Sequence, residues 1–252
     1  MKITLPENIK DITLDQFQKY NKLIGRDDLT EYQFNKRKIE IFTELNRGQV
    51  DNVKKTEIKE IIDQIDLALN QDVKFEPTFK MKGVEFGFIP NLDEITGAEY
   101  VDLDKYKTEV DTLHNVMAIL FRPIKDKDSF NNYTLYSYKG TSEYAELMKQ
   151  MPLSIANGAL FFFFEFSNRI SELYPEIYGG GTSEGKVASN YFEKWGWYAT
   201  IDELSKGNIL KIDKVLSLNI HYIHKFLAHK IDKQKLKASI MKKGSNTNTI
   251  EL

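Results

Sequence analysis

The sequence predicts a mainly α protein (α+β) with a helical bundle-like core and one β-hairpin near residues 78–89. Apolar residues recur at helical spacing through most of the chain, whereas alternation with a period of two is strong only around residues 78–89. In addition, 41% of the 252 residues are hydrophobic, which provides a core and argues against global disorder. The length suits one large domain or two small ones.

The composition excludes several classes of function. The chain has 35 basic and 37 acidic side chains, so it is not a generally basic coat for nucleic acid. It has no cysteine, which removes disulfides, cysteine-ligated zinc, iron–sulfur clusters and thiol nucleophiles. The N-terminal residues do not have the layout of a signal peptide, so we expect no export.

Three helices are predicted in the first 70 residues. Thr13 and Gln16 fit a capping box for a helix that continues to about residue 24. Thr30 is the expected cap of a second helix, which Gly48 ends. Thr56 is the expected cap of a third helix, whose isoleucines fall on one face.

The pattern then changes from helical spacing to alternation. Apolar residues alternate with polar ones on both sides of Lys82–Gly83, which predicts a hairpin with glycine at a positive-φ position and Pro90 at its end. An acidic segment, residues 93–111, leads into a predicted helix over 108–121 that Arg122–Pro123 ends. Residues 133–138 are a second, weaker strand candidate, and residues 141–150 a short helix.

The most apolar helix is predicted over residues 153–174, with Pro152 at its start. Its apolar residues cover nearly every face, so we expect other elements to surround it. The apolar run, residues 151–166, is shorter than the roughly 20 residues that a membrane-spanning helix needs. We therefore predict a buried core helix and no membrane span.

A glycine-rich break at residues 179–185 divides the chain into a helical body with the hairpin, residues 1–178, and a C-terminal helical part, residues 186–243. Helices are expected over 186–194, 198–205, 213–229 and 232–243. Residues 244–252 form a polar tail, which we expect to be flexible.

Two patterns suggest chemistry, and each has a structural alternative. Residues 180–186 satisfy the G-x-x-x-x-G-K pattern of a phosphate-binding loop, but Val187 follows where a Ser or Thr would bind Mg²⁺, so a linker is favoured. His221 and His224 are three positions apart on a predicted helix and could share a metal, or they could flank a core stripe. No catalytic motif is present, and we predict no enzyme activity, cofactor or metal.

Seven residues are candidates for partner binding. Trp195, Trp197 and Tyr198 combine apolar area with hydrogen-bonding edges, and they serve either as core plugs or as interface anchors. Arg122 precedes a proline at a predicted helix end, where its guanidinium can bind free carbonyls or a partner carboxylate.

The remaining candidates are three lysines of the basic C-terminal segment, Lys233, Lys235 and Lys237. The acidic segment at 93–111 and the basic segment at 225–243 can complement each other within the fold or between copies in an assembly. Contact of the lysines with nucleic acid is a weaker alternative, because aromatic residues that would stack on bases are sparse beyond Phe226.

Several stretches resemble small virion or tail-assembly proteins of tailed bacteriophages, with the crAss-like phages as the nearest group. The stretches are LP at 5–6, ITLDQF at 12–17, MAILFRPI at 117–124, YKGT at 138–141, MPLSIANGA at 151–159 and WGWY at 195–198. The resemblance spans about residues 3–240, and no single motif in it is diagnostic.

The resemblance implies a non-enzymatic virion-associated protein, structural or cargo, of the portal or tail region. Its implied partners are other phage structural proteins of the portal, tail or ring, and further copies of itself. The alternatives are a tail-assembly chaperone absent from the mature virion and a nucleic-acid-binding module. The implied location is the virion, or the host cytoplasm during assembly.

Overall fold

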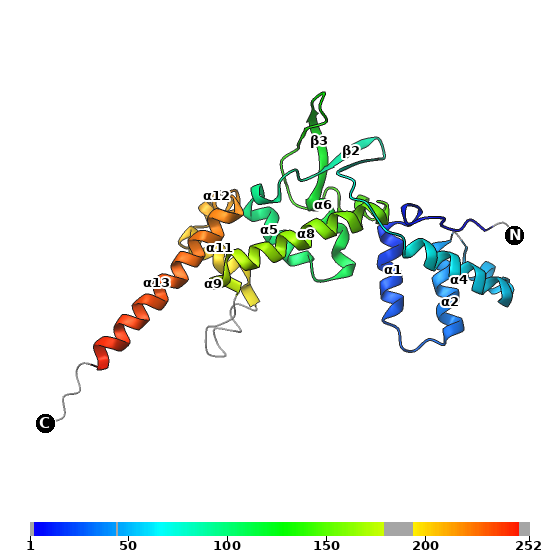
Figure 1. Cartoon of the computed structure of the whole chain (residues 1–252), viewed down its shortest axis with the longest axis horizontal. Helices are drawn as coiled ribbons and strands as arrows, with labels where there is room; N and C mark the ends of the chain where they lie inside the picture. The colour runs from blue at the N-terminus through cyan, green and yellow to red at the C-terminus, as the bar shows by residue number, and fades with distance from the viewer. Residues whose placement is uncertain (1–2, 44, 179–193, 247–252) are drawn as a thin grey trace. The chain divides into compact units, whose positions relative to one another are not determined.

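A computed structural model describes residues 3–43, 45–178 and 194–246 (Figure 1). The chain forms two compact units. The first comprises Met1–Pro90 and Asp102–Phe162, and the second comprises Asn91–Val101 and Phe163–Leu252. This division differs from the predicted boundary between residues 178 and 186, and the glycine-rich segment at 179–185, with Lys186, lies outside the described residues. The mainly α, α+β fold class is confirmed.

The first unit begins with the short helix η1 (Ile9–Asp11) and the helices α1 (Leu14–Ile24) and α2 (Glu31–Phe42). Both α1 and α2 start with the predicted capping boxes; for example, the Thr13 backbone N–H donates to Gln16 Oε1 at 2.8 Å. The prediction that α2 continues to Gly48 was wrong, because a separate helix, α3 (Arg47–Asp51), starts with its own cap at Asn46.

Helix α4 (Lys55–Leu69) starts one residue before the predicted cap. Its N-cap is Lys54, which makes no side-chain capping bond, so Thr56 lies inside the first turn. The predicted isoleucine face is buried, with Ile58, Ile61 and Ile65 all turned into the core. This packing, rather than a cap, therefore holds the start of the helix.

A four-stranded antiparallel sheet lies in the first unit, with the strand order β1 (Thr78–Met81), β2 (Val84–Phe88), β3 (Phe121–Lys127), β4 (Tyr133–Leu135). The predicted hairpin is confirmed, and its two turn residues, Lys82 and Gly83, have φ values of 48° and 82°. Two consecutive positive φ angles are typical of the type I′ turn, which matches the twist of the strands. The strand candidate at 133–138 is confirmed over its first three residues.

Strand β3 corrects the helix predicted over 108–121. The chain forms η3 (Val110–Thr112) and α6 (Leu113–Leu120), and it becomes extended at Phe121. Pro123 disfavours the helical conformation for the residue before it, so Arg122 is extended and pairs with Gly87 of β2. Arg122 thus lies in a strand and not at a helix C-terminus.

The core of the first unit forms where the sheet meets α6. The rings of Phe79, Phe86, Phe88 and Phe121 contact one another, with centroid distances of 5.1 Å for Phe79–Phe121 and 5.4 Å for Phe88–Phe121. All side chains of α6 from Val116 to Leu120 are buried. The short helix α7 (Ala145–Met148) packs against α6.

Helix α8 (Leu153–Leu173) has the predicted position but not the predicted burial, and it contributes residues to both units, as does α5 (Gly97–Tyr106). Phe163 is buried, whereas Phe161 is 61% exposed and Phe164 is also exposed. Four consecutive phenylalanines point around the whole helix, so packing on part of its circumference leaves some of them in solvent. No helix among the described residues is long and apolar enough to cross a membrane.

The second unit contains η2 (Leu92–Glu94), α9 (Pro175–Tyr178), α11 (Trp197–Ser205), η4 (Ile209–Lys211), α12 (Ile212–Leu216) and α13 (Ile220–Asn246). The predicted helices 213–229 and 232–243 are replaced by α12 and one unbroken helix, α13 (Figure 1). No glycine or proline interrupts residues 220–243, so nothing in the sequence ends the helix there. The predicted tail, residues 244–252, is helical through Asn246, and its last six residues lie outside the described residues.

His114 on α6 is expected to make the stability depend on pH. Burial lowers the pKa of its imidazole, and the Lys149 ammonium lowers that pKa further, against smaller opposing effects of Glu146 and Asp111. The unfolded chain therefore holds the proton more tightly, so stability present above the ordinary pKa of 6.5 is lost as the pH falls through the folded pKa.

We expect the stability advantage of the wild type over His114→Gln to shrink as the pH is lowered from about 7.5 to about 5. Urea titrations of both proteins across this range measure the difference. Parallel pH profiles of the two unfolding free energies would contradict the assignment.

Candidate functional site

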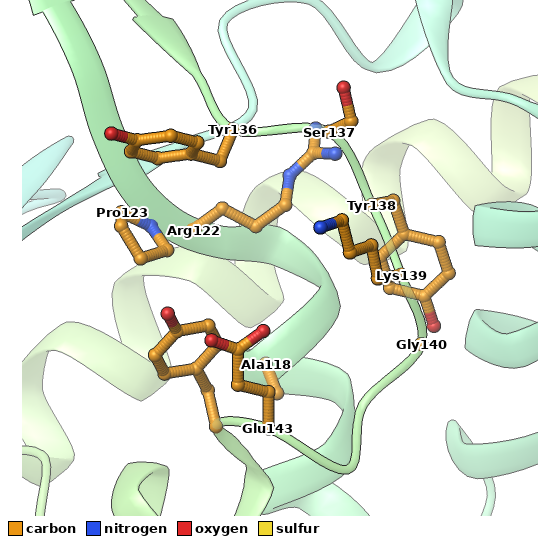
Figure 2. Close-up of a pocket in the computed structure, with 10 residues that line it drawn as sticks. Ala118, Arg122, Pro123, Tyr136, Ser137, Tyr138, Lys139, Gly140 and Glu143 are labelled. Atoms are coloured by element: carbon orange, nitrogen blue, oxygen red, sulfur yellow. The ribbon is translucent and has the colours of Figure 1, made fainter.

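A cavity of about 350 Å³ in the first unit is lined by Arg122, one of the seven residues for which the sequence predicted partner binding (Figure 2). It lies between the start of β3, the segment 136–140 that follows β4, and Glu143–Tyr144 just before α7. Its charged lining side chains are Arg122, Lys139 and Glu143, and its aromatic ones are Tyr136, Tyr138 and Tyr144. We refer to it as the Arg122 pocket.

Local backbone features bring these residues together. The Tyr136 backbone N–H donates to the Pro123 carbonyl at 3.1 Å, which holds the segment after β4 beside the start of β3. The Tyr138 hydroxyl donates to the Asp102 carboxylate on α5, which fixes the outer wall. Gly140 has a φ of 92°, a conformation that favours glycine, and the chain turns there towards Glu143.

The electrostatics of the pocket favour a negatively charged ligand. Arg122 is half-buried, and its Nε atom is fully buried, whereas Lys139 is exposed. The hydrogen bond to the Glu143 carboxylate, together with burial, raises the pKa of the Tyr144 phenol. Glu143 thus accepts a hydrogen bond from the Tyr144 hydroxyl, and the lining contains two cationic side chains and one carboxylate.

Figure 2 shows the orientation of the charged side chains that line the pocket. The Lys139 ammonium and the Glu143 carboxylate both point into the space beside the Arg122 side chain, and the Tyr136 ring forms one wall (Figure 2). Guanidinium and ammonium groups bind carboxylates through charge-assisted hydrogen bonds, and tyrosine rings supply apolar contact with a polar edge. The cavity can thus hold a carboxylate attached to an apolar or aromatic body.

The aromatic candidates divide between surface and core of the second unit. Trp195 and Tyr198 are exposed, with ring centroids 5.7 Å apart. Trp197 is half-buried, and its ring lies 5.5 Å from the Tyr100 ring and 5.7 Å from the His224 ring. Trp197 is therefore a core residue, whereas Trp195 and Tyr198 retain the exposure that an interface anchor needs.

His221 and His224 both make hydrogen bonds within the second unit, as expected for histidines beside a core stripe. The His224 Nδ1 atom lies 3.0 Å from the Ile220 carbonyl oxygen, and Nε2 lies 2.6 Å from the Tyr178 hydroxyl. His221 bridges the Tyr174 hydroxyl at 2.8 Å and the Asp93 carboxylate at 3.0 Å. All four ring nitrogens thus have hydrogen-bonding partners, and no group of three or more His, Asp or Glu suited to a metal is present among the described residues.

The three lysine candidates, Lys233, Lys235 and Lys237, are all exposed on α13. They belong to the second unit and Arg122 to the first. Sequence reasoning missed Lys139, Glu143 and Tyr136 as neighbours of Arg122. The signal available was the dense run of tyrosines and charges at 136–144, directly after a strand candidate.

Comparison of the chain with protein-family models, with curated proteins and with solved structures finds no match.

Proposed function

We propose that this protein is a non-enzymatic component of a bacteriophage virion, in the portal or tail region, which acts by binding other phage proteins. The resemblance of the six sequence stretches to phage assembly proteins supports the phage setting. The observation that carries the binding role is the Arg122 pocket, in which two cations and three tyrosines surround a cavity of about 350 Å³.

The chemistry of the pocket suits a carboxylate on a partner protein. Arg122 presents a planar fork of donors that matches the two oxygens of a carboxylate, and Lys139 adds a second positive charge. Glu143 disfavours a doubly charged anion, because its own carboxylate faces the same space. A single Asp, Glu or C-terminal carboxylate next to an apolar side chain is the ligand that fits.

Mass spectrometry of purified, nuclease-treated particles of the phage that encodes the chain tests the virion role. Peptide counts are compared with those of the portal protein. We expect this protein at a fixed ratio to the portal. Absence from particles, with abundance in infected cells, would overturn the virion role in favour of a tail-assembly chaperone.

Arg122→Ala is expected to weaken the binding of a carboxylate probe. N-acetylphenylalanine presents a carboxylate beside an aromatic ring, and its amide is the uncharged match. A charge-assisted hydrogen bond contributes about 1.5–3 kcal/mol, so the loss of Arg122 weakens binding by about 10- to 100-fold. Titrations followed by NMR chemical shifts measure the affinity of each probe.

Lys125→Ala is the matched control, because Lys125 is an exposed cation on the same strand, outside the pocket lining. Lys139→Ala removes the second cation of the pocket. Because Lys139 is exposed, this variant tests the site even where Arg122→Ala fails to fold. Equal binding of the acid and the amide, or equal loss with Lys125→Ala, would rule out a carboxylate site.

A further inference from the structure

We propose that the distal part of α13 of one copy docks into an acidic-rimmed groove on the first unit of a second copy. The inference goes beyond the proposed function, because it concerns another surface and a second copy of this chain. It stands on three observations: the exposure of the helix, the arrangement of its side chains, and a groove of matching chemistry.

The distal part of α13 is exposed on every side. Each described residue from Asp232 to Met241 is exposed, and Leu236 and Ile240 are each 60% exposed. A helical segment that packs against no other described part of its own unit gains stability only from local interactions, which are marginal in water. A partner that covers the two apolar side chains would supply the missing stabilisation.

The side chains of this segment form one basic and apolar face. Leu236 and Ile240 are four positions apart and so lie one turn apart on the same face. Lys233 lies three positions before Leu236, and Lys237 lies three positions before Ile240, so the two lysines border the apolar pair along one side. Lys235 lies away from this face, at about 100° per residue around the helix. We call Lys233, Leu236, Lys237 and Ile240 the docking face.

The groove lies between the N-terminal segment and the start of α4, and its volume is about 840 Å³. Val53 and Ile61, both buried, and Ile3 and Leu5, both half-buried, supply its apolar lining. Its rim carries three exposed carboxylates, Glu7, Glu57 and Glu60, and one ammonium, Lys54, which lies 3.7 Å from Glu57. The three negative charges and one positive charge give the groove a net charge of −2.

The docking face and the groove are complementary in both properties. Two apolar side chains one turn apart match the usual anchors of a helix in a groove, and two lysines meet a rim of net negative charge. A nucleic acid would be repelled by this rim. Since every copy carries both surfaces, a second copy is a sufficient partner.

Charge reversal on the docking face tests the inference in the full chain. Sedimentation equilibrium after nuclease treatment measures the mass over a range of protein concentrations. We expect the wild type to exceed the monomer mass of 29.3 kDa as concentration rises, and to dissociate as salt is added. The double variant K233E/K237E is expected to associate about tenfold more weakly or worse, whereas K235E, the matched control, keeps the wild-type affinity.

A charge swap between copies tests the groove itself. E57K/E60K alone is expected to be monomeric, and its mixture with K233E/K237E is expected to form a complex, because the acidic helix of one then faces the basic groove of the other. Far-UV circular dichroism checks that each variant is folded.

Three results would overturn the inference. These are a wild type that stays monomeric at all concentrations, equal weakening by K235E, and a mixture that fails to associate. Association only before nuclease treatment would assign the lysines to nucleic acid instead. None of these results touches the Arg122 pocket, whose probe is measured separately.

Discussion

Phe121→Ala is expected to lower the free energy of unfolding by about 3–5 kcal/mol. Phe121 is fully buried, and its ring contacts the rings of Phe79 and Phe88 at centroid distances of 5.1 Å and 5.4 Å. It is also the residue at which α6 gives way to β3, so the cavity would open between the helix and the sheet. Urea unfolding followed by far-UV circular dichroism measures the loss.

Two variants separate packing from the mere loss of a phenylalanine. Phe121→Leu keeps most of the volume and is expected to cost about 1.5 kcal/mol or less. Phe130→Ala removes the same side chain from a position that is 84% exposed, and its effect is expected to stay within about 0.5 kcal/mol. Similar losses for Phe121→Ala and Phe130→Ala would contradict the proposed core.

His224→Ala is expected to destabilise the second unit by about 3–5 kcal/mol. The His224 ring is fully buried and lies 4.9 Å from the Tyr174 ring and 5.1 Å from the Tyr100 ring. A carbonyl oxygen only accepts, so Nδ1 carries the proton towards Ile220, and Nε2 accepts from the Tyr178 hydroxyl. The variant opens a cavity and deprives the Tyr178 hydroxyl of this acceptor.

Native-state hydrogen exchange measures this loss by region. Amides of α9 and of the first turns of α13 are expected to exchange faster in His224→Ala. The control is His229→Ala, an exposed histidine on the same helix. Unchanged protection in His224→Ala would show that the packing of His224 between the rings of Tyr174 and Tyr100 does not stabilise the second unit.

The parts of the fold that the sequence predicts well depend on neighbours in the chain. The capping boxes at Thr13 and Thr30 involve residues three positions apart, and the hairpin at Lys82–Gly83 joins adjacent strands. Strand β3 depends instead on pairing with β2, more than 30 residues earlier, and residues 108–121 alone look helical. Pairing between distant strands leaves little pattern in the local sequence. The helix was therefore predicted to continue to residue 121, whereas α6 ends at Leu120 and β3 begins at Phe121.

In the candidate site, too, the sequence predicted single residues but not the distant residues that lie beside them. Arg122 was selected as a helix-end residue, whereas its neighbours in the pocket come from the chain segment after β4. The pair His221 and His224 left a metal site and a core stripe open, because spacing alone does not reveal the tyrosines that enclose them. The exposure of Phe161 was missed, since an apolar residue on a helix does not show how much of the helix is covered.

The chain has two tryptophans, Trp195 and Trp197, and both belong to the second unit. Intrinsic tryptophan fluorescence therefore reports on the second unit alone, whereas far-UV circular dichroism reports on the helices of both. A thermal melt followed by the two signals compares the units without labels or truncation. Transitions at one temperature would mean that the units unfold together, and separate transitions would assign the emission change to the second unit.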